Sequence, residues 1–168
     1  MLLRRTIQLL SIVGHAAAQK TPSQFSDQSR SFDILNQART DVGVQMLAWS
    51  PDLAAYAQYW ANEMATDRQP FAHATGPYRP QQGETLYEQQ SGQCHISYDT
   101  PLETAIRAWI GQAALYDGHP VTTGREPWLH WSQCVWSGST QVGCASAYSI
   151  STPYTVYIVC RFFPEGNV

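Results

Sequence analysis

The residues of this sequence with the most obvious chemical potential gather between residues 127 and 144, in the segment PWLHWSQCVWSGSTQVGC. The alternation of residue types predicts a β-strand over residues 128–136, which would place His130, Ser132 and Cys134 on one face. An imidazole on such an element can bind a metal ion or donate a hydrogen bond. The same pattern also fits a core strand that carries a hydrogen-bonded histidine, so both interpretations stay open.

The segment resembles a signature of the CAP superfamily, which comprises the cysteine-rich secretory, antigen 5 and pathogenesis-related 1 proteins. That signature reads G-H-Y-T-Q-V-V-W followed by G-C, and residues 129–136 here read LHWSQCVW, with Gly143 and Cys144 at the usual offset. A second signature, C-N-Y-x-P-x-G-N, has its counterpart in CRFFPEGN at residues 160–167. The resemblance covers residues 30–168 and is to the fungal- and plant-type pathogenesis-related 1 proteins.

The resemblance implies a central cleft lined by two histidines and two acidic residues. Matched by position, these are His73, His130 and Glu84, while Gln112 stands where the family has its second acid. Two imidazoles can bind a divalent metal such as zinc, with Glu84 as a ligand or as the group that orients a ring. Gln112 cannot act as a base or supply charge, which weighs against acid–base catalysis. The alternative is a hydrogen-bonded network that only holds loops together.

A lipid site is the second functional prediction. Fungal and plant members of the family bind sterols, and some relatives hold fatty acids between helices. The candidate residues here are four aromatic side chains around the loop-rich segment 67–97: Tyr59, Trp60, Phe71 and Tyr78. A lipid needs an apolar slot with a few polar groups. The alternative is that these aromatic residues belong to the ordinary core.

The four cysteines suggest two disulfides in an oxidising compartment. Cys144 and Cys160 flank a hairpin whose turn centres near residues 152–153, so they face each other across two antiparallel strands. This leaves Cys94 and Cys134 as a second pair. The alternative for those two is that both remain free thiols.

The N-terminus resembles an export signal. Residues 1–18 combine Arg4 and Arg5 with a short apolar stretch and a run of three alanines, as a signal peptide does, and residues 19–29 form a flexible lead-in. A cytosolic N-terminal tail is the alternative. Removal of this segment takes away two arginines and leaves a net charge of −5, which does not favour binding to nucleic acid.

Secondary-structure signals divide the remaining chain into a helical first half and a β-rich second half. The first helix should begin near Phe32 after a Ser31 cap, the second should cover residues 51–65 after a Ser50 cap, and the third should begin at Pro101. Strands are predicted over residues 128–136, 141–148 and 154–163. In the family this order builds an α+β fold, a three-layer α-β-α sandwich with a central antiparallel sheet, so residues 30–168 should be a single domain.

Together these features predict a secreted, monomeric protein that binds a sterol or fatty acid and is not an enzyme, with a role in lipid export or at a host–microbe boundary. One alternative is a metal-dependent or serine-type peptidase that uses His73, Glu84 and His130. Ser132 lies close to His130 in sequence, but no G-x-S-x-G motif surrounds it. The other alternative is a module that an extracellular protein partner recognises through loops 67–97 and 117–127.

Overall fold

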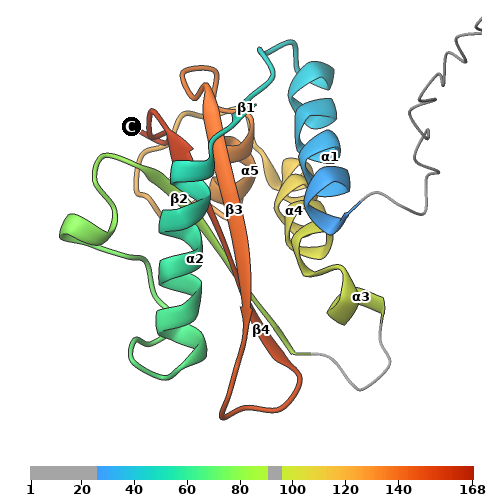
Figure 1. Ribbon diagram of the computed structural model, residues 1–168. Coiled ribbons are helices and arrows are strands. Elements are labelled where there is room, and N and C mark those ends of the chain that lie inside the picture. The colour runs from blue at the N-terminus through green and yellow to red at the C-terminus, as the bar shows by residue number, and fades with distance from the viewer. Residues whose placement is uncertain (1–25, 91–95) are drawn as a thin grey trace, which may run out of the picture.

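The computed structural model describes residues 26–90 and 96–168, which form three layers (Figure 1). A four-stranded sheet with the order β1-β3-β4-β2 lies between helix α2 on one face and helices α1, α4 and α5 on the other. The sheet is antiparallel except for the two-residue strand β1, which pairs with β3 in parallel. The predicted α-β-α sandwich with a central antiparallel sheet is confirmed.

The order of the elements along the chain is α1 (Asp27–Asp41), β1 (Ala48–Trp49), α2 (Pro51–Ala65), the 3-10 helix η2 (Gly76–Tyr78), β2 (Gly83–Gln90), α3 (Ile96–Asp99), α4 (Pro101–Gly111), the 3-10 helix η3 (Gln112–Leu115), α5 (Leu129–Cys134), β3 (Gln141–Tyr148) and β4 (Thr155–Phe163). The longest connections between elements lie between α2 and β2 and between η3 and α5. None of these helices is long and apolar enough to cross a lipid bilayer.

Helix α1 begins five residues before the predicted start at Phe32. The Ser26 side chain caps it by accepting a hydrogen bond from the backbone N–H of Ser29 at 3.1 Å. Asp27 then accepts hydrogen bonds from the first backbone N–H groups of α4, including that of Leu102 at 2.8 Å. This contact between helices is not visible in local sequence. Residues 27–29 are therefore helical rather than a flexible lead-in, and the predicted segments 1–18 and 19–25 lie outside the described residues.

The predicted strand over residues 128–136 is wrong, because this segment forms helix α5. Three consecutive side chains, those of Ser132, Gln133 and Cys134, are buried, whereas a half-buried strand would bury every second one. The helix has only six residues, which is too short for the sequence pattern to separate helical from strand periodicity.

The predicted loop over residues 67–97 contains a strand that the sequence analysis missed. Strand β2 pairs with β4 in antiparallel register along all eight of its residues. Its sequence, GETLYEQQ, is largely polar, so it lacks the apolar pattern of a core strand. Glu84, Thr85 and Gln89 are nevertheless buried.

Strands β3 and β4 form the predicted hairpin. Cys144 and Cys160 are direct partners in its register and are joined by the predicted disulfide. Cys134 is a buried free thiol, so the predicted bond between Cys94 and Cys134 is not formed, and Cys94 itself lies outside the described residues. Burial raises the pKa of the Cys134 thiol to about 12, which keeps it protonated and unreactive.

A buried arginine joins α1 to the segment between α5 and β3. Arg39 is fully inaccessible, and its guanidinium donates to main-chain carbonyl oxygens at 2.7–3.0 Å. The four acceptors belong to Gln45, Cys134, Trp136 and Ser139. The bonds to Cys134 and Ser139 are buried, so this one cation supplies donors to main-chain oxygens that are shielded from water.

We expect Arg39→Met to lower the free energy of unfolding by at least about 3 kcal/mol, because two buried and two partly buried carbonyls lose a charged donor. Arg107→Met is the matched control, since Arg107 is exposed and pairs with Glu103 on the surface of α4. It should change stability by less than about 1 kcal/mol. Urea denaturation of the oxidised protein measures both effects. Equal midpoints for the two variants would contradict the structural role of Arg39.

Candidate functional site

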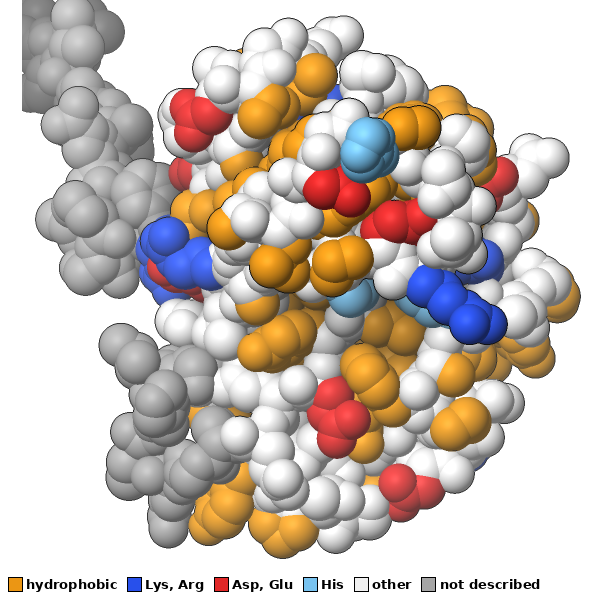
Figure 2. Space-filling view, turned by 180° about the vertical axis from the view of Figure 1, so that it is seen from behind, with side chains coloured by type: hydrophobic (Ala, Val, Ile, Leu, Met, Phe, Trp, Pro, Cys, Tyr) orange, Lys and Arg blue, Asp and Glu red, His pale blue; other side chains and the backbone are white. Residues whose placement is uncertain are grey.

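The four matched cleft positions come together in the folded chain. His73, Glu84, Gln112 and His130 all line one cavity of about 610 Å³. Figure 2 shows recessed histidine side chains on one face of the molecule, with basic side chains beside them. The cavity is also lined by residues that the sequence analysis did not select, among them Arg79, Gln82, Arg125, Glu126, Gln133 and Glu165.

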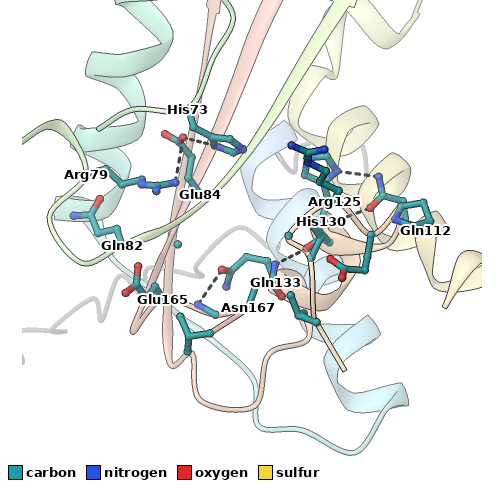
Figure 3. Close-up of a pocket in the computed structure, with 18 residues that line it drawn as sticks. His73, Arg79, Gln82, Glu84, Gln112, Arg125, His130, Gln133, Glu165 and Asn167 are labelled. Carbon is teal, nitrogen blue, oxygen red and sulfur yellow. Dashed lines mark hydrogen bonds and ion pairs between the residues drawn. The ribbon is translucent and has the colours of Figure 1, made fainter. Parts of the chain in front are cut away.

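Glu84 lies on β2, and its carboxylate is fully buried. One oxygen, Oε1, lies 2.6 Å from Nδ1 of His73 and accepts a hydrogen bond from the backbone N–H of Ala74 at 3.0 Å. The other oxygen, Oε2, forms an ion pair with Nη2 of Arg161 at 2.8 Å. Glu84 therefore orients the His73 ring (Figure 3), and both of its oxygens are occupied by partners from this chain.

Arg161 is the residue of this site that the sequence analysis missed most clearly. It lies on β4 directly opposite Glu84, and neither side chain is accessible to solvent. Its Nη1 also donates to the carbonyl oxygen of Tyr78 at 2.9 Å and to Oε1 of Gln82 at 3.3 Å. The signal was a lone charge in the otherwise uncharged run TVYIVCRFF. A charge in a buried strand requires a partner.

His130 and Gln112 form the opposite side of the cleft. Oε1 of Gln112 accepts hydrogen bonds from the backbone N–H groups of His130 at 3.1 Å and Trp131 at 3.4 Å, in the first turn of α5. Nε2 of Gln112 lies 2.9 Å from Nδ1 of His130. The ring also stacks on Trp109 with a centroid separation of 6.1 Å. Burial, with a smaller effect of nearby His73, lowers the pKa of His130, so this imidazole is neutral at pH 7.

The C-terminal signature segment closes this side of the cavity through α5. Gln133 is almost fully buried, and its Oε1 accepts a hydrogen bond from the backbone N–H of Gly166 at 3.0 Å. A Cβ atom at Gly83 would overlap the Gln133 amide, so β2 needs a glycine at this position. The Ser132 hydroxyl bonds to Oδ1 of Asn167 at 2.6 Å and to the carbonyl of Leu129. Ser132 therefore helps to hold the segment and makes no hydrogen bond to His130.

The side chains of the cleft do not fit a resident metal ion in this arrangement. Among residues 26–90 and 96–168, no group of three or more His, Cys, Asp or Glu is placed to hold a metal. Both oxygens of Glu84 already have protein partners, and Gln112 brings an uncharged amide in place of a carboxylate. Of the four matched positions, only the two imidazoles of His73 and His130 remain as potential ligands, one fewer than the three protein ligands of a typical catalytic zinc site.

Three of the four candidate lipid-binding residues come together beside α2. Tyr59 and Tyr78 stack in parallel at 5.6 Å, and Trp60 contacts Tyr78 at 6.0 Å from the buried side. Phe71 lies apart and packs against Tyr157. An open groove of about 670 Å³ runs along this surface, and its lining consists of Asp52, Ala55, Tyr56, Tyr59, Pro77 and Tyr78.

We expect Glu84→Gln to lower the free energy of unfolding by about 3–5 kcal/mol, because it leaves the buried Arg161 cation without a counter-charge. Adding Arg161→Met should recover part of this loss. Arg79→Met is the control, since Arg79 is partly exposed and lies 4.0 Å from the same carboxylate. Chemical denaturation of the wild type, Glu84→Gln, Arg161→Met and the double variant forms a double-mutant cycle and measures the coupling free energy between the two residues. Additive effects of Glu84→Gln and Arg161→Met would contradict the pairing.

Comparison with known sequences gives a consistent assignment. Residues 32–162 match the family model CAP, described as the cysteine-rich secretory protein family. The pathogenesis-related protein PR-1 of Medicago truncatula is 33% identical over 165 residues, which cover 95% of this chain and 88% of that protein. Pathogenesis-related protein 1A of Nicotiana tabacum is 33% identical over 168 residues, which cover 99% of this chain and 89% of that protein.

Comparison with solved structures supports the same fold. BmVAL-1 superposes with a TM-score of 0.69 at 23% identity, covering 89% of this chain and 81% of that one. NaASP2, solved with Zn2+, superposes with a TM-score of 0.70 at 19% identity, covering 90% of this chain and 86% of that one. The matched signatures and the α-β-α sandwich agree with these findings, and the chain belongs to the CAP family of cysteine-rich secretory proteins.

Proposed function

We propose that this protein is exported and binds a small apolar ligand, a sterol in the first place, in the aromatic groove beside α2. The observation that carries the proposal is the cluster of exposed rings along this groove: Tyr56, Tyr59 and Tyr78 are each 39–45% exposed. Large aromatic surfaces gathered on one open groove mark binding sites more often than isolated exposed rings do. The volume of about 670 Å³ lies within the usual range of ligand pockets.

The groove is supported from behind, which favours binding without a large ordering cost. The Trp60 indole N–H donates to the carbonyl of Ala72 at 2.9 Å and holds the loop after α2. The carbonyl of Tyr78 accepts from the buried Arg161 at 2.9 Å and anchors the opposite wall. The lining includes polar groups as well, on Asp52 and the tyrosine side chains. A carboxylate in the lining can accept a hydrogen bond from a sterol hydroxyl but repels a fatty-acid carboxylate, so a sterol fits this groove better.

Export is supported by the disulfide and by the family. The bond between Cys144 and Cys160 is typical of proteins that fold in an oxidising compartment. The signal peptide proposed for residues 1–18 would provide the route. A net charge of −3 for the whole chain argues against nucleic acid as a partner. We further propose that the protein acts as a monomer, in lipid export or at a host–microbe boundary.

The alternative functions have weaker support. The zinc-containing structure of NaASP2 favours a metal bound by His73 and His130, but the arrangement of Glu84 and Gln112 argues against it. A peptidase would need a base or an activated nucleophile. The Ser132 hydroxyl is hydrogen-bonded to Asn167 and to the carbonyl of Leu129 and not to His130. Recognition by an extracellular protein through the loops at 67–97 and 117–127 has no contact that favours it over a lipid.

We expect saturable binding of labelled cholesterol by the oxidised protein, and weaker binding of palmitate. Tyr78→Ser and Tyr59→Ser should each weaken cholesterol binding at least about tenfold, because each removes an aromatic ring from the groove. Phe71→Ala and Ile150→Ser, which change exposed apolar side chains outside the groove, serve as controls. Equilibrium binding to the purified variants measures the effect.

Two outcomes would contradict the proposal. If neither lipid binds saturably, the protein is not a carrier of these ligands. If cholesterol binds but Phe71→Ala weakens it as much as Tyr78→Ser does, the site is not the groove described here. Circular dichroism of each variant separates loss of binding from loss of folding.

A further inference from the structure

The orientation of the Gln112 side-chain amide is fixed by main-chain donors. Its Oε1 accepts from the backbone N–H groups of His130 and Trp131, which are among the first N–H groups of α5 and have no partner within that helix. If the amide were flipped, its NH2 group would face these two N–H groups, and donors would oppose donors. The assignment of oxygen and nitrogen therefore follows from the hydrogen-bond network.

This orientation determines which nitrogen of His130 carries the proton. Nε2 of Gln112 is an amide nitrogen, which can donate but cannot accept, so Nδ1 of His130 must accept at 2.9 Å. The proton of the neutral ring then resides on Nε2. His130 lines the cavity, and Nε2 is the ring nitrogen left to meet a ligand. It meets that ligand as an N–H donor.

A metal site requires the opposite tautomer. A histidine that binds a metal presents a nitrogen lone pair, and its other nitrogen donates an N–H to a carboxylate or a carbonyl. A glutamate at position 112 could cap α5 with one oxygen and accept Nδ1–H of His130 with the other. Gln112 also caps α5 through its Oε1, but its Nε2 donates a hydrogen bond to Nδ1 of His130 instead of accepting one. Nε2 of His130 therefore presents an N–H donor to the cleft, where the opposite tautomer would present a nitrogen lone pair.

We propose that Gln112 makes this cleft a site for an oxygen acceptor, specifically a carboxylate, in place of a divalent metal. Two further cations, Arg79 and Arg125, line the same cavity. Two of the acidic residues have partners from this chain: Glu84 pairs with the buried Arg161, and Oε1 of Glu126 accepts the backbone N–H groups of the 122–123 turn, which lower the pKa of Glu126 and keep its negative charge. Glu165 also lines the cavity and limits the site to small or singly charged carboxylates.

The first test is the tautomer itself. Long-range 1H–15N spectra of the folded protein at neutral pH should show the Nε2–H form of His130 in the wild type and the Nδ1–H form in Gln112→Glu. This readout needs neither a ligand nor an activity. A wild-type Nδ1–H form would overturn the proposal, as would an unchanged tautomer in Gln112→Glu.

The second test is zinc binding by titration calorimetry. Gln112→Glu should bind zinc about 10–100-fold more tightly than the wild type, the usual effect of a partner behind a histidine ligand. Gln82→Glu is the matched control, because it adds one carboxylate to the same cavity without contacting His130. It should not raise zinc affinity to the same degree. Equal affinities in wild type and Gln112→Glu, or an equal gain in the control, would overturn the exclusion of metal.

The third test uses sodium acetate as the carboxylate probe, against sodium chloride at equal ionic strength. Acetate should shift the His130 Nε2 resonance saturably in the wild type, and the response should be at least about tenfold weaker in Gln112→Glu, where the added negative charge repels acetate. If chloride shifts the resonance equally, or if acetate gives no saturable response, the carboxylate assignment is wrong. Native-like spectra of each variant confirm folding in all three tests.

Discussion

The ion pair between Glu84 and Arg161 is the contact on which both candidate sites depend. The two residues are direct neighbours on β2 and β4, and their side chains are completely shielded from water. Burial of two charges is costly unless their remaining hydrogen-bonding groups also find partners. Here His73 and Ala74 are such partners on the acid and the carbonyl of Tyr78 is one on the arginine, whereas Nε of Arg161 has no hydrogen-bond partner among the described residues. The pair therefore positions the cleft histidine and the wall of the aromatic groove at the same time.

This arrangement explains how a segment with little regular structure can hold functional groups. Residues 66–82, between α2 and β2, contain only one 3-10 turn, η2, yet they supply His73 to the cleft and Tyr78 to the groove. Rigid functional groups on loops require fixed anchor points on the scaffold. Glu84 and Arg161 are such points, because both lie within the paired region of β2 and β4. Any movement of one strand relative to the other would displace both sites together.

Sequence alone predicted the architecture and the positions of the cleft residues, but not the contacts that define their chemistry. A signature located His130, matching by position to the family selected His73, Glu84 and Gln112, and hairpin register paired Cys144 with Cys160. Local patterns failed at α5 and β2, where burial is set by packing against distant elements rather than by an apolar period. The partner of a buried charge and the tautomer of a ring depend on atoms that the fold brings together, so neither can be read from spacing.

The exchange of a carboxylate for an amide at position 112 illustrates how one scaffold can carry different chemistry. Both groups can cap α5, so the fold does not distinguish them. They differ in the atom that faces Nδ1 of His130. In glutamine it is an N–H donor, which requires the Nε2–H tautomer of His130, and in glutamate it is an oxygen acceptor, which favours the Nδ1–H tautomer. The fold can therefore be assigned without knowing whether position 112 carries an amide or a carboxylate, whereas the class of ligand that we propose depends on that group. In this chain, Gln112 and His130 line one cavity, and the amide at position 112 sets the tautomer of the imidazole there.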